Sequence, residues 1–171
     1  MSLNNYYADF YTATILEWKP VLKPDKFKDI IISSLKFLVE NKRITLYAFV
    51  IMHNHIHLIW QMHDDHKSKD VQQSFMKYTA QIILKELRNN HPKVLEILKV
   101  NAKDRKYQVW ERNSLSISLW SRPVFMQKLE YLHNNPIRAG LCKYPENYKY
   151  SSASFYLTAK NDWSFLTHYE G

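Results

Sequence analysis

The chain has little cysteine and little glycine: Cys142 is its single cysteine and two glycines occur in 171 residues. One cysteine excludes an internal disulfide and any zinc site built from several cysteines. No internal repeat or low-complexity linker occurs. The chain also lacks a charged-then-apolar signal segment at its start and any apolar run near 18 residues, so we expect a cytoplasmic protein without a membrane anchor.

What is present predicts a compact basic domain. Hydrophobic residues make up 46% of the chain and aromatic residues 15%, enough for a core in one domain spanning residues 1–171. The net charge is +8 and the pI is about 9.4, which favours polyanionic partners such as nucleic acid. Charge alone does not decide between DNA and other partners.

Paired histidines in an apolar segment are the most informative motif. The run from Tyr47 to Trp60 predicts two strands with a tight connection near His53 and Asn54. Alternate strand residues share a face, so His55 and His57 are expected about 6.6 Å apart, together with Ile59. Two imidazoles at this spacing can bind one cation, although rings that are half exposed or hydrogen-bonded to neighbours are the commoner case.

A second motif lies in a predicted helix that begins after Ser121, its expected N-cap, with Pro123 in the first turn. Pro136 disfavours helix at the residue before it, so we expect this helix to end at Asn135 or earlier. Tyr131 and Asn135 lie one turn apart on one face. If that face meets the histidines, a phenol nucleophile lies beside a His-His-Asn metal site. By spacing alone, an ordinary amphipathic-helix tyrosine is the simpler interpretation.

The remaining pattern predicts an α+β fold. We expect strands at 9–18, 44–51, 55–62, 107–111 and 116–120, and helices at 25–41, at 68–90 with Ser68 as cap, and at 92–99. Apolar spacing predicts that the second long helix buries Val71, Phe75, Tyr78, Ile82 and Leu87. The order describes a ferredoxin-like split βαβ antiparallel sheet with helices on one face and an added C-terminal helix carrying the tyrosine. Its third strand, which carries the histidines, is central.

Three blocks of sequence together resemble one family. They are Met52-His-Asn-His-Ile-His-Leu58, Tyr131-Leu-His-Asn-Asn-Pro-Ile-Arg-Ala-Gly-Leu141 and Pro145-Glu-Asn-Tyr-Lys-Tyr-Ser-Ser-Ala153. In this order they are similar to the single-tyrosine transposases with a His-hydrophobic-His motif, and more narrowly to the REP-associated branch. The resemblance spans roughly residues 9–156, leaving a short C-terminal extension. His53 departs from the family, which usually has proline at that position.

The resemblance implies an activity. Such enzymes nick and rejoin single-stranded DNA near hairpins or palindromes through a 5′-phosphotyrosine, with a divalent metal, Mg²⁺ or Mn²⁺. It makes Tyr131 the nucleophile and His55, His57 and Asn135 the metal ligands. A covalent intermediate keeps the phosphate activated, and a divalent ion neutralises charge that develops on it. Relatives include dimers as well as single chains, so a homodimer stays open, and no small-molecule substrate is expected.

Candidate DNA contacts are basic or aromatic residues expected to rim this site. Trp110 and Trp120 could stack on unpaired bases, although core packing is the commoner role. The basic candidates are Arg138, Lys128, Arg105, Lys106, Arg112, Arg122 and Lys77.

Two other functions stay open at this stage. One is a catalytically poor, domesticated protein that binds DNA hairpins without cutting them. The other is a ferredoxin-like RNA-binding domain, for which the chain shows no aromatic-rich strand motif. His133, two residues from Tyr131, is expected to point away from it.

Overall fold

The computed structural model describes residues 5–171, which excludes the first four residues of the predicted domain. Its main elements are β1 (Asp9–Thr14), α1 (Asp25–Glu40), β2 (Ile44–Ile51), β3 (His55–Met62), α2 (Ser68–Asn90), α3 (Pro92–Ile97), β4 (Leu115–Ser118), α4 (Arg122–Arg138) and α5 (Ala153–Leu157). Two short 3-10 segments, η2 (Leu16–Trp18) and η3 (Pro145–Asn147), complete the chain.

The sheet confirms the predicted fold class. Its four strands lie in the order β2-β3-β1-β4, and every neighbouring pair is antiparallel. With α1 after β1 and α2 after β3, this is the split βαβ arrangement of a ferredoxin-like layer. β3 lies between β1 and β2, so His57 has Thr12 on one side and Val50 on the other. The histidines are therefore in the middle of the sheet.

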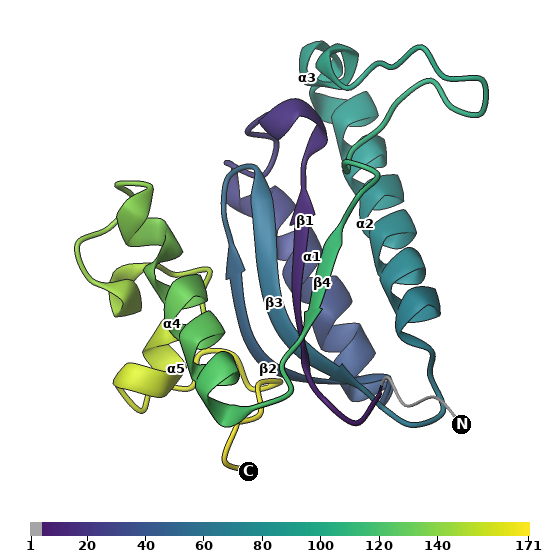
Figure 1. The fold of residues 1–171 in the computed structure, drawn as a ribbon. Helices are drawn as coiled ribbons and strands as arrows, with labels where there is room; N and C mark the ends of the chain where they lie inside the picture. The colour runs from purple at the N-terminus through teal and green to yellow at the C-terminus, as the bar shows by residue number, and fades with distance from the viewer. Residues whose placement is uncertain (1–4) are drawn as a thin grey trace.

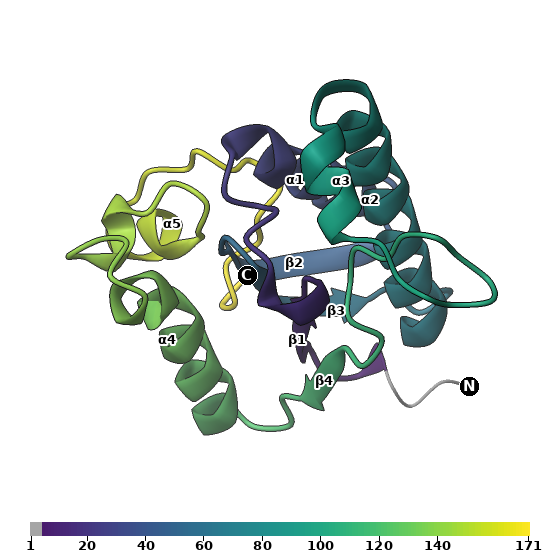
Figure 2. The same ribbon diagram turned by 90° about the horizontal axis from the view of Figure 1, so that it is seen from above.

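Each face of the sheet packs against its own helices. The larger core joins α1 and α2 to one face through residues such as Tyr11, Leu58 and Trp60. The smaller core lies on the opposite face, where Phe10 and Ile59 pack near Leu129 and Leu132 of α4. Figure 1 and Figure 2 show α4 on the side of the sheet away from α1 and α2. The expected added helix is thus present, on its own face.

The histidine hairpin has the predicted bounds, whereas the first strand is shorter than predicted. β1 ends at Thr14, and the chain then enters η2, where Glu17 and Trp18 have φ of 53° and 58°. Non-glycine residues seldom adopt this left-handed region. The turn ends the strand and leaves the Trp18 side chain exposed.

Helix α2 has the predicted bounds but a different buried face. Thr79 and Ile83 are buried with Val71, Phe75 and Leu87, whereas Tyr78 is exposed. Placing Tyr78 and Ile82 in the core was therefore wrong. The Thr79 hydroxyl bonds to the Phe75 carbonyl oxygen and accepts the indole N–H of Trp110, which makes burial of this polar residue possible.

Two local predictions about caps and strands were also wrong. Ser68 is the first residue of α2 rather than its cap, a position that Lys67 occupies without a side-chain bond. The segment 107–111 forms only isolated bridges, Lys99 with Tyr107 and Ile15 with Trp110, so it is not a strand. The last strand is Leu115–Ser118, shifted one or two residues from the predicted 116–120.

Helix α4 begins as predicted and continues past the expected end. The Ser121 hydroxyl accepts the Val124 N–H at 3.4 Å, confirming the cap. The helix does not stop at Asn135 but runs to Arg138, with Pro136 inside it. Pro136 removes one helical hydrogen bond, yet it is buried beside Leu132, and this packing outweighs the local preference. The extra turn places the Arg138 side chain against Tyr131.

The C-terminal segment covers one edge of the sheet. Backbone N–H groups of Ser152 and Thr167 donate to the carbonyl oxygens of Phe49 and Leu46 on β2, each at 2.9 Å. Phe165 and Leu166 are buried in the larger core. The residues after 156 therefore belong to the packed structure. Across residues 5–171, no helix combines the length and apolar character needed to cross a bilayer.

Candidate active site

A cavity of about 410 Å³ lies between α4 and the face of the sheet that carries His55 and His57. The four predicted site residues reach it from two elements that are far apart in sequence, β3 and α4. The wall is completed by β1, β4 and the turn after β1. The lining residues are Phe10, Thr12, Trp18, His55, His57, Leu115, Ile117, Lys128, Tyr131 and Asn135.

The two histidines share one sheet face, as the alternation of β3 predicted. Their ring centroids lie 4.9 Å apart with the planes at 75°. His57 is buried and stacks on Phe10 at 5.1 Å, while His55 meets the edge of Trp18 at 5.5 Å. The rings are thus held against aromatic neighbours rather than free in solvent.

Hydrogen bonds orient both imidazoles. The Asn54 side-chain amide donates to the Trp18 carbonyl oxygen, so its Oδ1 accepts the Nδ1–H of His55 at 2.7 Å. Nδ1 of His57 lies 2.8 Å from the Thr12 hydroxyl. The Nδ1–H of His55 leaves the lone pair of that ring on Nε2, and the Thr12 hydroxyl can accept from Nδ1 of His57 in the same tautomer. This is the arrangement by which neighbouring groups prepare histidines to bind a metal.

Helix α4 brings the other two predicted residues to the same place. Asn135 is buried and lines the same cavity as His55 and His57. Tyr131, one turn earlier, is 44% exposed and lies 5.6 Å from the His57 ring, centroid to centroid. A phenol with this exposure is accessible to a polymeric substrate, whereas His55 is partly exposed and His57 is buried.

Two cations flank the Tyr131 ring. The Arg138 guanidinium carbon lies 4.4 Å from the ring centroid, and one of its nitrogens donates to the Tyr131 carbonyl oxygen at 2.7 Å. The Lys128 ammonium lies 5.5 Å from the Tyr131 centroid and 5.2 Å from that of Phe10. Positive charge therefore surrounds the point where an anionic phosphate would meet the phenol.

Burial keeps the imidazoles neutral. Burial, with a smaller contribution from His55 and then from Arg138 and Lys128, lowers the pKa of His57 to about 3. Burial also lowers the pKa of His55, and the hydrogen bond to Asn135 partly opposes this. Near neutral pH both rings therefore offer lone pairs and no charge.

These donors fit a divalent metal of the kind that imidazole binds. Two neutral imidazoles and one amide oxygen converge on one cavity. Among residues 5–171, no three His, Cys, Asp or Glu side chains cluster as a metal site would require. A cation would therefore have the two histidines and Asn135 as protein ligands, with other positions available to water and phosphate oxygen.

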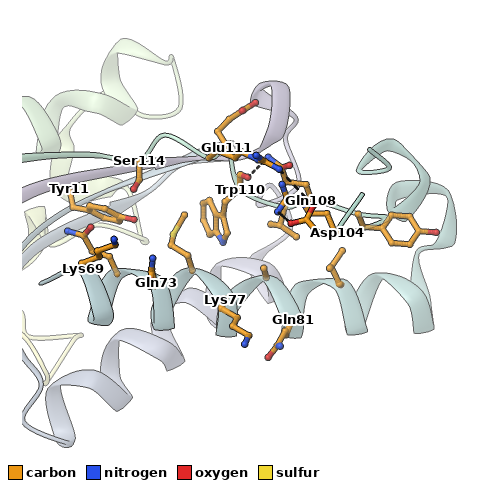
Figure 3. A pocket seen from close by; sticks show the side chains of 18 residues that line it. Tyr11, Lys69, Gln73, Lys77, Gln81, Asp104, Gln108, Trp110, Glu111 and Ser114 are labelled. Carbon is orange, nitrogen blue, oxygen red and sulfur yellow. Dashed lines mark hydrogen bonds and ion pairs between the residues drawn. The ribbon is translucent and has the colours of Figure 1, made fainter. Parts of the chain in front are cut away.

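Several predicted DNA contacts lie away from this cavity. Lys77, Arg105 and Arg112 line a separate cavity of about 750 Å³ between α2 and the segment 104–114. Figure 3 shows it, with Lys77 on α2 and Asp104 and Trp110 on the facing segment. Tyr11 also lines this separate cavity, whereas Phe10 and Thr12 line the cavity that contains Tyr131, which we call the tyrosine cavity. Because neighbouring strand residues point to opposite faces, the two cavities lie on opposite faces of the sheet. These residues do not rim Tyr131.

The other candidates have distinct positions. Lys106 is exposed beside the Tyr107 ring, and Arg122 pairs with Glu170 at the start of α4. Trp110 is buried in the core, whereas Trp120 is 67% exposed. His133 points away from Tyr131 as expected, but it is buried, with Nε2 2.7 Å from the Ser152 hydroxyl.

The sequence did not indicate four residues that shape the site: Phe10, Thr12, Trp18 and Asn54. Thr12 and Phe10 lie next to the histidines only because β1 pairs with β3 in one particular register, Thr12 opposite His57. Sequence patterns do not specify that register. Asn54 was within the motif, and its place immediately before His55 was the one available signal.

No protein-family model and no curated protein matches the chain. Among solved structures, the REP-associated tyrosine transposase bound to a REP hairpin matches with a TM-score of 0.66 and 14% identity, over 96% of this chain and 89% of that one. A protein from Deinococcus radiodurans R1, provisionally described as a transposase, gives 0.47 and 14%, over 78% and 95%. The first likeness confirms, at the level of the fold, the expected resemblance to the REP-associated branch.

Proposed function

We propose that this chain is a transposase-type enzyme that nicks and rejoins single-stranded DNA near hairpins through a phosphotyrosine. One observation carries the proposal: Tyr131, His55, His57 and Asn135 line one cavity although they come from β3 and α4. The solved structure with the same fold is a tyrosine transposase that was bound to a hairpin, which supports the choice of substrate.

The proposed reaction begins with the phenol. The Tyr131 oxygen attacks a backbone phosphorus and loses its proton to water. The bond from phosphorus to O3′ of the upstream sugar breaks, and O3′ takes a proton from water. The downstream fragment is then joined to the enzyme by its 5′-phosphate, and the upstream fragment leaves with a 3′-hydroxyl. Attack by such a hydroxyl on the phosphotyrosine restores the phosphodiester and the free phenol. The bond energy is conserved in the intermediate, so rejoining needs no external activation.

Residues around Tyr131 account for substrate binding. Lys128 and Arg138 attract the phosphate to the Tyr131 ring. Nε2 of His55, Nε2 of His57 and the Asn135 amide would hold Mg²⁺ or Mn²⁺, which when bound supplies charge neutralisation on the phosphate. Imidazole ligands suit Mn²⁺ better than Mg²⁺, so we expect tighter binding of Mn²⁺.

The position of the nucleophile favours action within one chain. Within one chain, the Tyr131 ring lies 5.6 Å from the His57 ring, and the His57 ring lies 4.9 Å from the His55 ring, centroid to centroid. A homodimer is thus not needed to complete the site. On the other face of the sheet, Lys77, Arg105 and Arg112 remain candidates for contacts with the duplex part of a hairpin.

Covalent capture tests this function. The protein is incubated with labelled oligonucleotides that carry hairpins with single-stranded flanks, in Mn²⁺, and resolved on a denaturing gel. We expect a shifted protein–DNA band that EDTA abolishes and that Tyr131→Phe lacks. Tyr144→Phe, at another exposed tyrosine, is the control and should retain the band. Hairpin binding without any adduct, under either metal, would instead indicate a binding protein that does not cut.

A further inference from the structure

A third cavity, of about 370 Å³, lies at the start of α4 and is lined mainly by aromatic rings; we call it the aromatic cavity. Two of them are unusually exposed for such large side chains: Trp120 is 67% and Tyr6 77% accessible. Exposed aromatic side chains that gather around one cavity, rather than being scattered singly, can form a binding surface. Its aromatic lining residues are Tyr6, Tyr7, Tyr47, Trp120, Phe125 and Tyr169.

The exposed rings are carried by anchored backbone. The Gln61 amide donates to the Tyr6 carbonyl oxygen at 3.1 Å, and Asn5 donates to the carbonyl oxygens of His63 and His66, each at 2.8 Å. Trp120 lies between buried Leu119, whose N–H bonds to the Ala8 carbonyl at 2.8 Å, and the N-cap residue of α4. A rigid aromatic surface binds a flat partner with little loss of conformational entropy.

The aromatic cavity and the tyrosine cavity follow one another along the same elements. On α4, residues spaced three apart reach both cavities: Arg122 and Phe125 line the aromatic cavity, and Lys128 and Tyr131 line the tyrosine cavity. Ala8, immediately before β1, lines the aromatic cavity, and Phe10 and Thr12 on β1 line the tyrosine cavity. At the end of β4, Ile117 lines the tyrosine cavity, and Leu119, just after the strand, lines the aromatic cavity. A DNA strand that leaves Tyr131 along these elements reaches the aromatic cavity next.

The separation is short on the scale of a nucleic acid. Nine helical residues from Arg122 to Tyr131 span about 13.5 Å, and four strand residues from Ala8 to Thr12 span about 13 Å. Stacked nucleotides of one strand are about 3.4 Å apart, so this equals at most about four nucleotides. Lys128 lies between the two cavities, where it can contact a phosphate of that segment.

We propose that the aromatic cavity binds an unpaired nucleobase of the DNA strand that places a phosphate at Tyr131. This base lies within about four nucleotides of that phosphate. The inference rests on the proposed function. Trp120 and Tyr6 supply the stacking faces. The charges beside them cancel, because Arg122 pairs with Glu170 at 3.1 Å. The contact is therefore one of stacking rather than of charge, unlike that of Lys128.

Binding without catalysis tests the stacking site. Affinity for a fluorescent single-stranded oligonucleotide is measured in EDTA, at several salt concentrations, so that no cleavage is needed. Trp120→Ala should weaken binding by about 5- to 150-fold, the usual effect of losing one base stack. Trp120→Phe should restore part of it. The matched control is Tyr78→Ala, at an aromatic residue that is 53% exposed on α2.

Salt separates stacking from charge. Trp120→Ala should leave the slope of log affinity against log salt unchanged, whereas Lys128→Ala should reduce it by about 0.7. An oligonucleotide series with one abasic position at a time then locates the base. At one position near the cleaved bond, the abasic site and Trp120→Ala should each weaken binding, and together no further.

Different outcomes overturn the two proposals separately. If a Tyr131 adduct forms but Trp120→Ala binds as tightly as the unchanged protein, the stacking site is wrong and the enzymatic function stands. If no adduct forms but the abasic position and Trp120 remain coupled, the stacking site stands and the function fails. The stacking site would also be contradicted if the loss of affinity caused by Trp120→Ala added in full to the loss caused by each abasic position in the series.

Discussion

At the scale of single residues, the orientation of the two imidazoles is the decisive feature. Thr12 contacts Nδ1 of His57 and Asn54 contacts Nδ1 of His55. A bare pair of histidines on a strand would have a choice of tautomer and ring angle. The Asn54 contact leaves the lone pair of His55 on Nε2, the Thr12 contact allows the same tautomer in His57, and burial keeps both rings uncharged. The chemistry proposed for the site depends on both conditions.

Thr12→Val should weaken Mn²⁺ binding by roughly 10-fold or more, because His57 loses the partner that orients it. Thr12→Ser, which keeps the hydroxyl, should behave like the unchanged protein. Thr14→Val is the matched control, since Thr14 lies on the same face of β1, opposite His55. Titration followed by electron paramagnetic resonance of free Mn²⁺ measures the affinity directly. Equal losses in the two valine variants would show a general effect on β1.

His57→Ala should abolish cleavage while leaving affinity for hairpin DNA within about twofold, because a buried metal ligand makes no contact with most of the DNA. The control is His63→Ala, at a histidine outside the cavity. Gel-based cleavage and fluorescence anisotropy provide the two readings. A large loss of affinity in His57→Ala would mean that the ring packs against DNA or supports the fold.

At the scale of the elements, α4 organises the site because it carries residues for two faces at once. Tyr131 and Asn135 face the histidine cavity, while His133 points into the packing between α4 and the segment before α5. The Ser152 hydroxyl that contacts His133 also meets the backbone of Phe49 on β2. His133 thus joins the tyrosine helix to the edge strand of the sheet.

Burial lowers the pKa of His133 to about 4, below the value of about 6.5 in an unfolded chain. Its contribution to stability is complete above pH 6.5 and is lost as the pH falls from 6.5 towards 4, because the unfolded chain gains the proton first. His133→Gln, which cannot titrate, should therefore lose less stability between pH 7 and 4.5 than the unchanged protein, by roughly 2 kcal/mol. Urea unfolding at both pH values measures this difference. The pH dependence of stability that comes from His55 and His57 is the same in His133→Gln and in the unchanged protein, so it cancels.

Element bounds were predictable where local chemistry decides them. Alternation set the limits of β3, and the Ser121 cap set the start of α4. The end of α4 was not predictable, because burial of Pro136 overrides a local rule. The buried face of α2 was missed for a similar reason: Thr79 enters the core only because Trp110, 31 residues away, supplies a hydrogen bond.

At the scale of the whole molecule, the two faces of the sheet have different chemistry. One face carries the tyrosine cavity with Lys128 and Arg138, and the other carries the cavity with Lys77, Arg105 and Arg112. The net charge of +8 predicted a polyanionic partner but not this division. Assigning basic residues to a face required the strand register and the path of the segment 104–114.

The assignment of basic residues to two faces of the sheet predicts how the salt dependence of DNA affinity changes on mutation. For an unstructured oligonucleotide, Lys128→Gln with Arg138→Gln should reduce the slope of log affinity against log salt by about 1.4, or about 0.7 for each phosphate that is no longer neutralised. Lys77→Gln, on the opposite face, should leave that slope unchanged and affect only oligonucleotides that carry a duplex stem. A reduced slope with Lys77→Gln on unstructured DNA would place the strand on the α2 face instead.

The most direct measurement of the central claim identifies the atom to which the DNA becomes attached. An oligonucleotide labelled at its 3′ end and a second labelled at its 5′ end are each incubated with the protein and Mn²⁺, and the adduct is digested and sequenced by mass spectrometry. We predict that only the 3′ label becomes linked to protein and that the modified peptide carries the mass at Tyr131. Attachment through another tyrosine, or linkage of the 5′-labelled fragment, would contradict the account.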